Sequence, residues 1–255
     1  NLTGLEGITS IGSDLYIQYN NSLSSLTGLE NLESIGGNLG IHNNYTLTSI
    51  AQLGNLTSVG GGIGIQDVPL SNLSGLEGLT SIEGSLMLGN SGQGGPNFTL
   101  TSLTGLENVT SIGGDVWITF CHVLINLAEL NNVTYIGGSL DIQGDDALTS
   151  LTGLENLDSI GGVVFIGENN SLKSLLGLES LTYIGENLVF FFNPVLNSLA
   201  GLENLMYVGG VLNILFQEDL RSLASLNALT TVGESIWITG NDALTSLTGL
   251  DNINT

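Results

Sequence analysis

The amino-acid sequence predicts an all-β-dominated solenoid of about ten coils, each about 24 residues long. Three observations support this prediction: a short motif that returns at a nearly constant interval, an alternation of apolar residues after it, and a series of leucines three positions apart. The motif reads Ile-Gly-Gly with variation, and seven of the nine intervals between its copies are 24 residues. Such a period is typical of repeats that stack on one another. The motif begins at Ile11, Ile35, Val59, Ile82, Ile112, Ile136, Ile160, Ile184, Val208 and Val232.

A short strand is predicted a few residues after each copy of this motif. Apolar residues alternate there with variable ones, as in Leu15/Ile17 and Val116/Ile118. A period of two is typical of a half-buried strand. Helix is disfavoured because the period is too short for a two-helix repeat and because Gly, Ser and Thr are abundant.

The leucines that follow each strand are predicted to form the core. Leu23, Leu26, Leu29 and Leu32 illustrate their spacing, which lets them point inward at successive bends of a flattened coil. One coil cannot cover these side chains, so stacked neighbours must complete the core.

A ladder of polar residues is predicted at the ninth position after each motif. An inward Asn can bond the backbone of its own coil and of a neighbouring coil, which satisfies polar groups that burial would leave unpaired. The single cysteine, Cys121, occupies this position and is predicted to be structural. The other members are Asn20, Asn44, Asp145, Asn169, Asn193, Gln217 and Asn241.

The repeat unit, G-x-L-x-I-x-x-N-x-x-L-x-S-L-x-G-L, covers nearly the whole chain. It resembles the leucine-rich, β-helix-like repeats of receptor L domains and is similar to the repeats of related cell-surface proteins of fungi and microbes. The resemblance implies a right-handed leucine-rich-repeat-like β-helix. It also implies an extracellular or cell-surface location, a role in adhesion, recognition or structural assembly, and a protein or glycan partner.

The repeats fill residues 1–255, which predicts a single domain with one insertion near residues 89–97. The sequence starts and stops in mid-repeat. Because a solenoid exposes apolar edges unless its ends are capped, two explanations remain open. The chain is the ordered part of a longer protein, or it associates end to end as the subunit of a filament.

The charge balance restricts the partners. The chain has 24 acidic residues against 2 basic ones and a formal net charge of −22. It therefore cannot neutralise a nucleic-acid backbone, and anionic membranes are poor partners. No apolar run approaches the ~18 residues of a membrane span.

An acidic residue follows Gly-Leu in most units, and stacking would align these carboxylates in a column about 5 Å apart. Two interpretations remain open: a cation-binding ribbon, with Ca²⁺ as the suitable ion, or a solvated column in which each carboxylate accepts local backbone hydrogen bonds. No other cofactor is predicted. The acidic column consists of Glu6, Glu30, Glu77, Glu107, Glu155, Glu179, Glu203 and Asp251.

No other group of residues predicts a metal centre or a catalytic site. Asp141, Asp145 and Asp146 are interpreted as surface turn residues, and His42 and His122 as isolated surface or turn histidines. Ser and Thr recur at fixed positions of the repeat, which indicates structural roles and not one unique nucleophile. The protein is therefore predicted not to be an enzyme.

The outward side of the strands is predicted to carry an interaction patch. Phe165, Val189, Phe191, Leu215 and Trp237 would form one apolar area across four coils, and such areas mark interaction sites. Two further aromatic residues at the outward position of other strands are Trp117 and Tyr16.

Five sequons are candidate glycosylation sites, which would make the chain a glycoprotein. The candidate sequons begin at Asn1, Asn55, Asn72, Asn108 and Asn132.

An alternative function is an ice- or carbohydrate-binding surface, because threonines also recur in one interrupted column that includes Thr57, Thr110 and Thr230.

Overall fold

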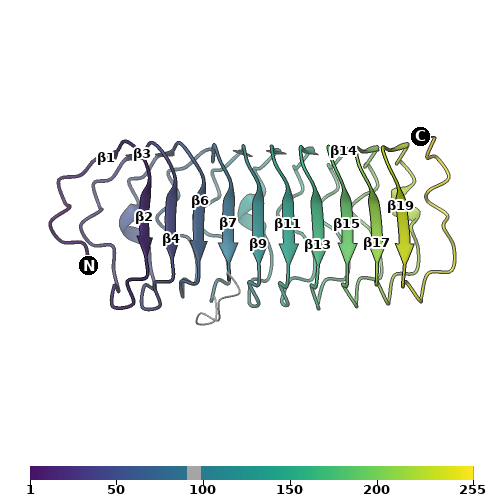
Figure 1. Cartoon of the computed structure of the whole chain (residues 1–255), viewed down its shortest axis with the longest axis horizontal. Helices are drawn as coiled ribbons and strands as arrows, with labels where there is room; N and C mark the ends of the chain where they lie inside the picture. Colours follow the sequence, from purple (N-terminus) through teal and green to yellow (C-terminus); the bar gives the residue numbers. More distant parts are fainter. Residues whose placement is uncertain (91–98, 255) are drawn as a thin grey trace.

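Among the residues that the structure describes, ten four-residue strands form one parallel sheet that runs along a rod (Figure 1). The computed structural model describes residues 1–90 and 99–254. Most of the predicted insertion, residues 91–97, lies outside the described residues. The strands of this ten-stranded sheet are β2 (Leu15–Gln18), β4 (Leu39–His42), β6 (Ile63–Gln66), β7 (Leu86–Gly89), β9 (Val116–Thr119), β11 (Leu140–Gln143), β13 (Val164–Gly167), β15 (Leu188–Phe191), β17 (Leu212–Leu215) and β19 (Ile236–Thr239).

Equivalent residues of successive coils pair with one another in this sheet. Val116 pairs with Leu140, and Trp117 with Asp141. The alternation predicted from the sequence is confirmed, since Val116 and Ile118 are fully buried while Trp117 between them is 38% exposed. Because the register is constant, each repeat position becomes a straight column along the rod.

The motif residues form a second set of parallel strands, each two residues long. These strands lie along the upper edge of the view in Figure 1 and form a three-stranded and a six-stranded sheet. An isolated bridge between Ile82 and Ile112 extends the six-stranded sheet by one coil. The strands are β1 (Ser10–Ile11), β3 (Ser34–Ile35), β5 (Ser58–Val59), β8 (Ser111–Ile112), β10 (Tyr135–Ile136), β12 (Ser159–Ile160), β14 (Tyr183–Ile184), β16 (Tyr207–Val208) and β18 (Thr231–Val232).

The predicted fold is confirmed as a β-solenoid of about nine turns. The chain descends along the long front strands and returns behind them as it advances toward the C-terminal end, which makes the coil right-handed (Figure 1). The leucines at the bends point inward as predicted: Leu26, Leu29 and Leu32 are buried. They form one continuous core with the inward residues of both sets of strands.

In the described part of the chain, three coils contain a short 3₁₀-helix at the bend that follows the ladder residue. These are η1 (Ala51–Leu53), η2 (Ala128–Leu130) and η3 (Ala224–Leu226). The equivalent bend of eight other coils contains a glycine with φ between 106° and 116°, such as Gly153 and Gly177. The solenoid therefore uses two kinds of turn at one position.

The polar ladder is present. The side-chain oxygen of Asn193 accepts the backbone N–H of Asn169 (3.1 Å), and the Asn193 Nδ2 donates to the carbonyl of Ile166 (3.0 Å). Cys121 is buried and donates its backbone N–H to Asp145, which agrees with its predicted structural role. Asn20 differs from the other Asn members because it lies in the first coil and stays exposed.

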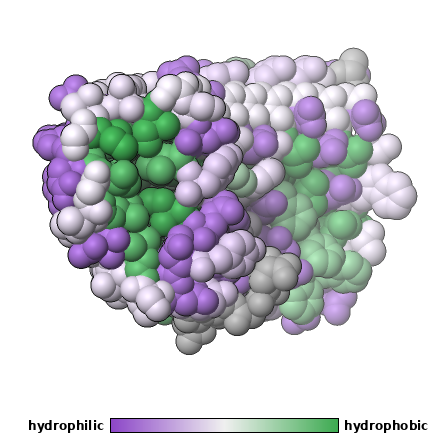
Figure 2. Space-filling view, turned by 60° about the vertical axis from the view of Figure 1, so that its left-hand side comes forward, coloured by the Kyte–Doolittle hydropathy of each residue, from purple (hydrophilic) through white to green (hydrophobic). Residues whose placement is uncertain are grey.

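Apolar side chains are partly exposed on both terminal coils. Leu5 is 36% exposed at the N-terminal end, and Ile236 and Leu247 are 40% and 57% exposed at the other. Figure 2 shows the N-terminal end face as a broad apolar area. These side chains occupy the same repeat positions that neighbouring coils cover elsewhere in the rod.

Candidate functional site

The outward face of the ten-stranded sheet presents exposed aromatic side chains. Tyr16 is 54%, Trp117 38% and Trp237 60% exposed. Further along the rod from the N-terminal end, apolar patches interrupted by hydrophilic residues lie on this side of the molecule (Figure 2). Exposed aromatic and apolar side chains on a flat sheet are suited to contact a partner.

The strand register decides which of the predicted patch residues lie together. Phe165 is adjacent to Val189, and Phe191 is adjacent to Leu215. Asn213 stands between Val189 and Trp237 in their row. The patch is therefore two short apolar rows with Trp237 at one end.

Two other members of the predicted site lie apart from these rows. Asp141 separates Trp117 from Phe165. Tyr16 is on β2, at the opposite end of the sheet. Tyr16 and Trp117 therefore share the face with the patch but are not continuous with it.

A pocket lies at the edge of this face, just beyond the C-terminal ends of strands β9, β11, β13 and β15. Its volume is about 450 Å³. The Phe120 ring lies over Gly144, since a Cβ on that glycine would be 2.5 Å from the ring. Phe191 forms another part of the wall and makes an edge contact with Phe216, with centroids 6.1 Å apart. The lining residues are Phe120, His122, Gly144, Asp146, Glu168, Asn170, Phe191 and Phe192.

Most of these residues could not be found by strand alternation. Phe120, Glu168 and Phe192 each follow the last residue of a strand and adopt a left-handed conformation, with φ of 56°, 57° and 51°. The side chain at such a position does not follow the inward–outward pattern of the strand. A sequence signal exists nonetheless: bulky residues here are unusual, because Gly and Asn adopt this conformation more readily.

Polar groups line the mouth of the pocket. The Nδ1 of His122 lies 2.8 Å from Asp146 Oδ2, and Asn170 donates from Nδ2 to Asp146 Oδ1 at 2.7 Å. The interpretation of His122 as an isolated residue was therefore wrong, because stacking brings it beside an acid exactly one period, 24 residues, further along the chain. His42, by contrast, lies half-buried at the end of β4, where burial lowers its pKa below the usual value.

The Glu168 carboxylate lies in the same pocket. Within the part of the chain that the structure describes, no hydrogen bond or ion pair engages its oxygens. Lys173 and Arg221, the two basic side chains, are both exposed and are not among the lining residues. The pocket therefore combines aromatic walls with an uncompensated negative charge.

Every member of the acidic column accepts a hydrogen bond from the backbone two residues earlier. The glycine N–H donates to the carboxylate at 2.8–3.0 Å in all eight cases, as in Gly177 to Glu179 (2.9 Å). The bond from Gly4 lowers the pKa of Glu6 below its usual value. The geometry supports the second interpretation of the column, in which carboxylates cap local backbone groups.

The three coils with a 3₁₀-helix replace both partners of this bond. Gln52, Glu129 and Ser225 stand where the glycine would be. The acidic position then holds Gly54, Asn131 or Asn227, each of which donates its N–H to the first carbonyl of the helix at 3.2–3.3 Å. The glycine and the carboxylate are thus present together or absent together.

Because the carboxylates already have backbone partners, we expect calcium not to stabilise the protein. The melting temperature should be the same in calcium and in chelator. Among the described residues, no group of three or more His, Cys, Asp or Glu side chains is arranged to hold a metal ion. A melting temperature several degrees higher in calcium would instead favour the cation-binding ribbon.

The interpretation of the Asp141, Asp145 and Asp146 cluster as surface turn residues was wrong for two of them: Asp145 is fully buried in the ladder, and Asp141 lies within strand β11. Its Oδ1 accepts the Cys121 N–H at 2.7 Å, and its Oδ2 has no partner among the described residues. Burial raises the pKa of Asp145 well above its usual value. Burial also raises the pKa of Asp141, on the outward face between Trp117 and Phe165, to about 6.

The candidate glycosylation sites differ in accessibility. Asn1, Asn55, Asn108 and Asn132 are exposed, and Asn72 is half-buried. The Nδ2 atoms of Asn55, Asn108 and Asn132 each donate to a carbonyl of the preceding coil at 2.6–2.8 Å. Glycosylation at these positions stays a prediction.

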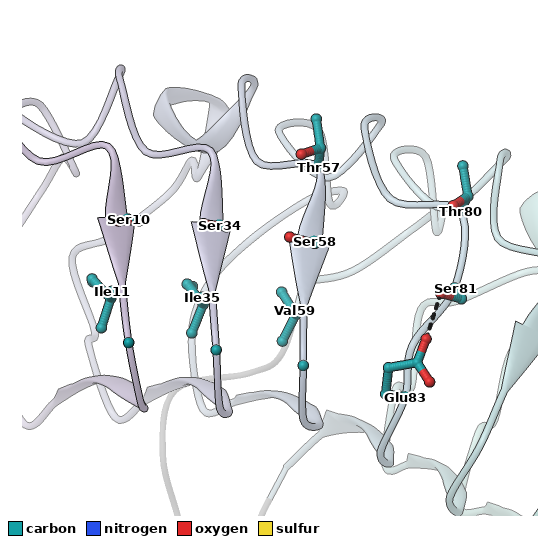
Figure 3. A pocket seen from close by; sticks show the side chains of 13 residues that line it. Ser10, Ile11, Ser34, Ile35, Thr57, Ser58, Val59, Thr80, Ser81 and Glu83 are labelled. Atoms are coloured by element: carbon teal, nitrogen blue, oxygen red, sulfur yellow. Dashed lines mark hydrogen bonds between the residues drawn. The ribbon is translucent and has the colours of Figure 1, made fainter.

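A second hollow, of about 480 Å³, lies over strands β1, β3 and β5 (Figure 3). Ser10, Ser34 and Ser58 line it, and at one side the Ser81 hydroxyl donates to Glu83 at 2.8 Å. The threonine column runs beside it, but Thr57 donates its hydroxyl to a carbonyl of the preceding coil (3.1 Å), as Thr110 does. Both hydroxyls donate to the backbone of the preceding coil, an arrangement that does not favour an ice-binding array.

Comparison with known proteins adds one match. Residues 108–204 match the family model of the receptor L domain, and a search of curated proteins found no significant match. Receptor L domains occur in the extracellular parts of cell-surface receptors. No helix in the described part of the chain is long and apolar enough to cross a bilayer. The matched segment contains Phe120, Glu168 and Phe192 of the pocket, and the β-solenoid to which it belongs fits receptor L-domain-like repeats.

Proposed function

We propose that this chain is a non-enzymatic extracellular module that recognises a protein partner at a cell surface, in adhesion or in receptor-type recognition. The contact surface is the outward face of the ten-stranded sheet. One observation supports this assignment above the others: Trp117 and Trp237 are 38% and 60% exposed on a face that also bears the apolar rows. Burial of such side chains by a partner is the main source of binding energy in protein interfaces.

A neutral glycan is the second candidate ligand on the same face. The observation that favours it is the row Trp117, Asp141 and Phe165, in which a carboxylate stands between two aromatic rings. Aromatic rings stack on sugars, and a carboxylate accepts hydrogen bonds from their hydroxyls.

End-to-end self-association stays a prediction, to be checked by sedimentation at rising protein concentration.

The proposed function is tested with the double variant Trp117→Ser, Trp237→Ser. Binding of the purified chain to an array of extracellular protein domains and glycans should fall at least tenfold, because both rings would be buried by the partner. The matched control is Tyr183→Ser, which removes an exposed aromatic side chain from the second set of strands. Equal binding by the double variant and the unmodified chain would rule out this face as the contact surface.

A further inference from the structure

The pocket at the edge of the face has the chemistry of a cation site. Phe120 and Phe192 contribute aromatic rings, and Glu168 contributes a carboxylate without a partner among the described residues. Aromatic faces attract cations, most strongly where water is partly excluded. A carboxylate between such faces provides the opposite charge for a group that stacks on the rings.

The charge of the whole chain favours the same class of ligand. The formal net charge is −22, and both basic side chains lie outside the pocket lining. A concave site of one sign concentrates the field of the surrounding charges and raises the local concentration of oppositely charged groups. A basic partner is therefore attracted to the rod, and the pocket gives that attraction a specific place.

The conformation of the lining residues also favours a role in binding. Phe192 adopts φ of 51° and is 44% exposed. A left-handed conformation is unfavourable for an L-residue, and a half-exposed ring recovers only part of its burial energy. Asn43 occupies the equivalent position of another coil with φ of 54°, so the fold itself does not require an aromatic residue here.

We propose that this pocket binds the guanidinium group of an arginine side chain on a basic protein partner. The planar guanidinium stacks on the Phe192 or Phe120 ring and donates paired hydrogen bonds to Glu168, a geometry that an ammonium group cannot reproduce. Asn170 and the His122–Asp146 pair form the rim around it. This inference rests on the proposed function and names the chemistry of its partner.

The test uses a short glycine peptide with a central arginine as the probe, and its citrulline counterpart, which has the same shape without the charge. Amide NMR signals of Gly144, Glu168 and Phe192 should shift on titration with the arginine peptide. Citrulline should bind at least tenfold more weakly. Glu168→Gln and, separately, Phe192→Asn should each weaken arginine binding about tenfold, since each removes one of the two recognition elements.

The control is Glu186→Gln, which makes the same charge change at an exposed residue just before the start of β15, the opposite end of that strand from the pocket. Equal weakening by Glu186→Gln and Glu168→Gln would show that only the net charge matters and would overturn the pocket assignment. If the citrulline peptide binds as tightly as the arginine peptide, the pocket does not require a positive charge and the proposal is wrong. A neutral oligosaccharide that shifts the same signals while the arginine peptide does not would replace the basic partner by a glycan.

These outcomes are separate from the test of the proposed function. Trp117 and Trp237 do not line the pocket, so the double serine variant should still bind the arginine peptide. If that variant loses partner binding while the arginine peptide shifts no pocket signal in the unmodified chain, the proposed function is supported and only the arginine site is ruled out.

Discussion

Replacement of Gly177 by glutamate is expected to destabilise the solenoid by about 4 kcal/mol or more. Gly177 has φ of 112°, which L side chains rarely adopt, and a Cβ there would overlap the carbonyl of Leu151 in the preceding coil. Because backbone lies on both sides of the contact, no side-chain rotation can relieve it. Urea denaturation followed by circular dichroism measures the loss.

Two additional substitutions should restore most of this stability. The triple variant Leu176→Ala, Gly177→Glu, Glu179→Asn reproduces the Ala-Glu-Leu-Asn turn of η2. In that turn the Glu129 carboxylate accepts from the Ser102 hydroxyl at 2.9 Å and from the Leu103 N–H at 3.2 Å.

The coil before Gly177 has the same types of donor for the new glutamate, although the Leu151 N–H now donates to the Leu176 carbonyl at 2.8 Å and has to change partner. Ser150, Leu151 and Thr152 match Ser102, Leu103 and Thr104 in the coil before η2. The pair Leu176→Ala, Glu179→Asn without the central change is the control, and it should lose only the carboxylate cap, about 1 kcal/mol. A triple variant no more stable than Gly177→Glu alone would show that the two turns are not interchangeable.

Asp145→Asn is expected to stabilise the protein by about 2 kcal/mol near neutral pH. An amide at this position would keep the bond to the Cys121 N–H and would donate from Nδ2 to the Ile118 carbonyl, as Asn169 donates to Ile142 at 3.0 Å. The carboxylate has no such donor unless it is protonated, and its Oδ2 is buried without a partner among the described residues. Thermal and urea unfolding of the two chains measure the gain.

The same group predicts a pH dependence with a definite sign. Because burial raises the pKa of Asp145 in the folded state, the folded chain keeps a proton that the unfolded chain releases above about pH 4. The contribution of Asp145 to stability is therefore greatest below about pH 4 and falls as the pH rises toward the folded-state pKa. Asp141, whose pKa is raised to about 6, acts in the same direction up to that pH.

Asp145→Asn should flatten this dependence, and the reciprocal variant Asn169→Asp should steepen it, since Asn169 occupies the same buried ladder position. The control is Asp146→Asn, which changes a partly exposed carboxylate and should have a much smaller effect on the unfolding free energy. The prediction would be contradicted if the unmodified chain were more stable at neutral pH than the Asp145→Asn variant.

The fold could be predicted because its determinants repeat. The alternation of Val116 and Ile118 around an outward residue, and the spacing of Leu26, Leu29 and Leu32, each recur in almost every coil. A pattern that recurs in this way identifies the inward side of the chain with little ambiguity. The ladder followed for the same reason, because a polar residue at a fixed place between apolar ones has to satisfy buried backbone groups.

The site was less predictable because its geometry depends on turns and on stacking. Strand alternation gave Phe191 and Trp237 but says nothing of Phe120 or Phe192, which follow the strand in a left-handed conformation. His122 and Asp146 look unrelated until the period of 24 places them in one column. The capping role of Glu179 was visible in principle, because the coils without an acid at this position also lack the glycine, as Gln52 and Gly54 show.

The two kinds of turn also bear on how such a rod can evolve. Passage from one turn to the other changes at least the glycine and the acidic residue two positions later, and the glycine-to-side-chain step alone creates the overlap expected for Gly177. A change made one residue at a time would therefore pass through a destabilised intermediate sequence. Duplication or exchange of whole 24-residue coils avoids it, since each copy brings a matched glycine and carboxylate or a matched 3₁₀ turn. The linkage between these residues thus favours growth of the gene by recombination in units of one coil.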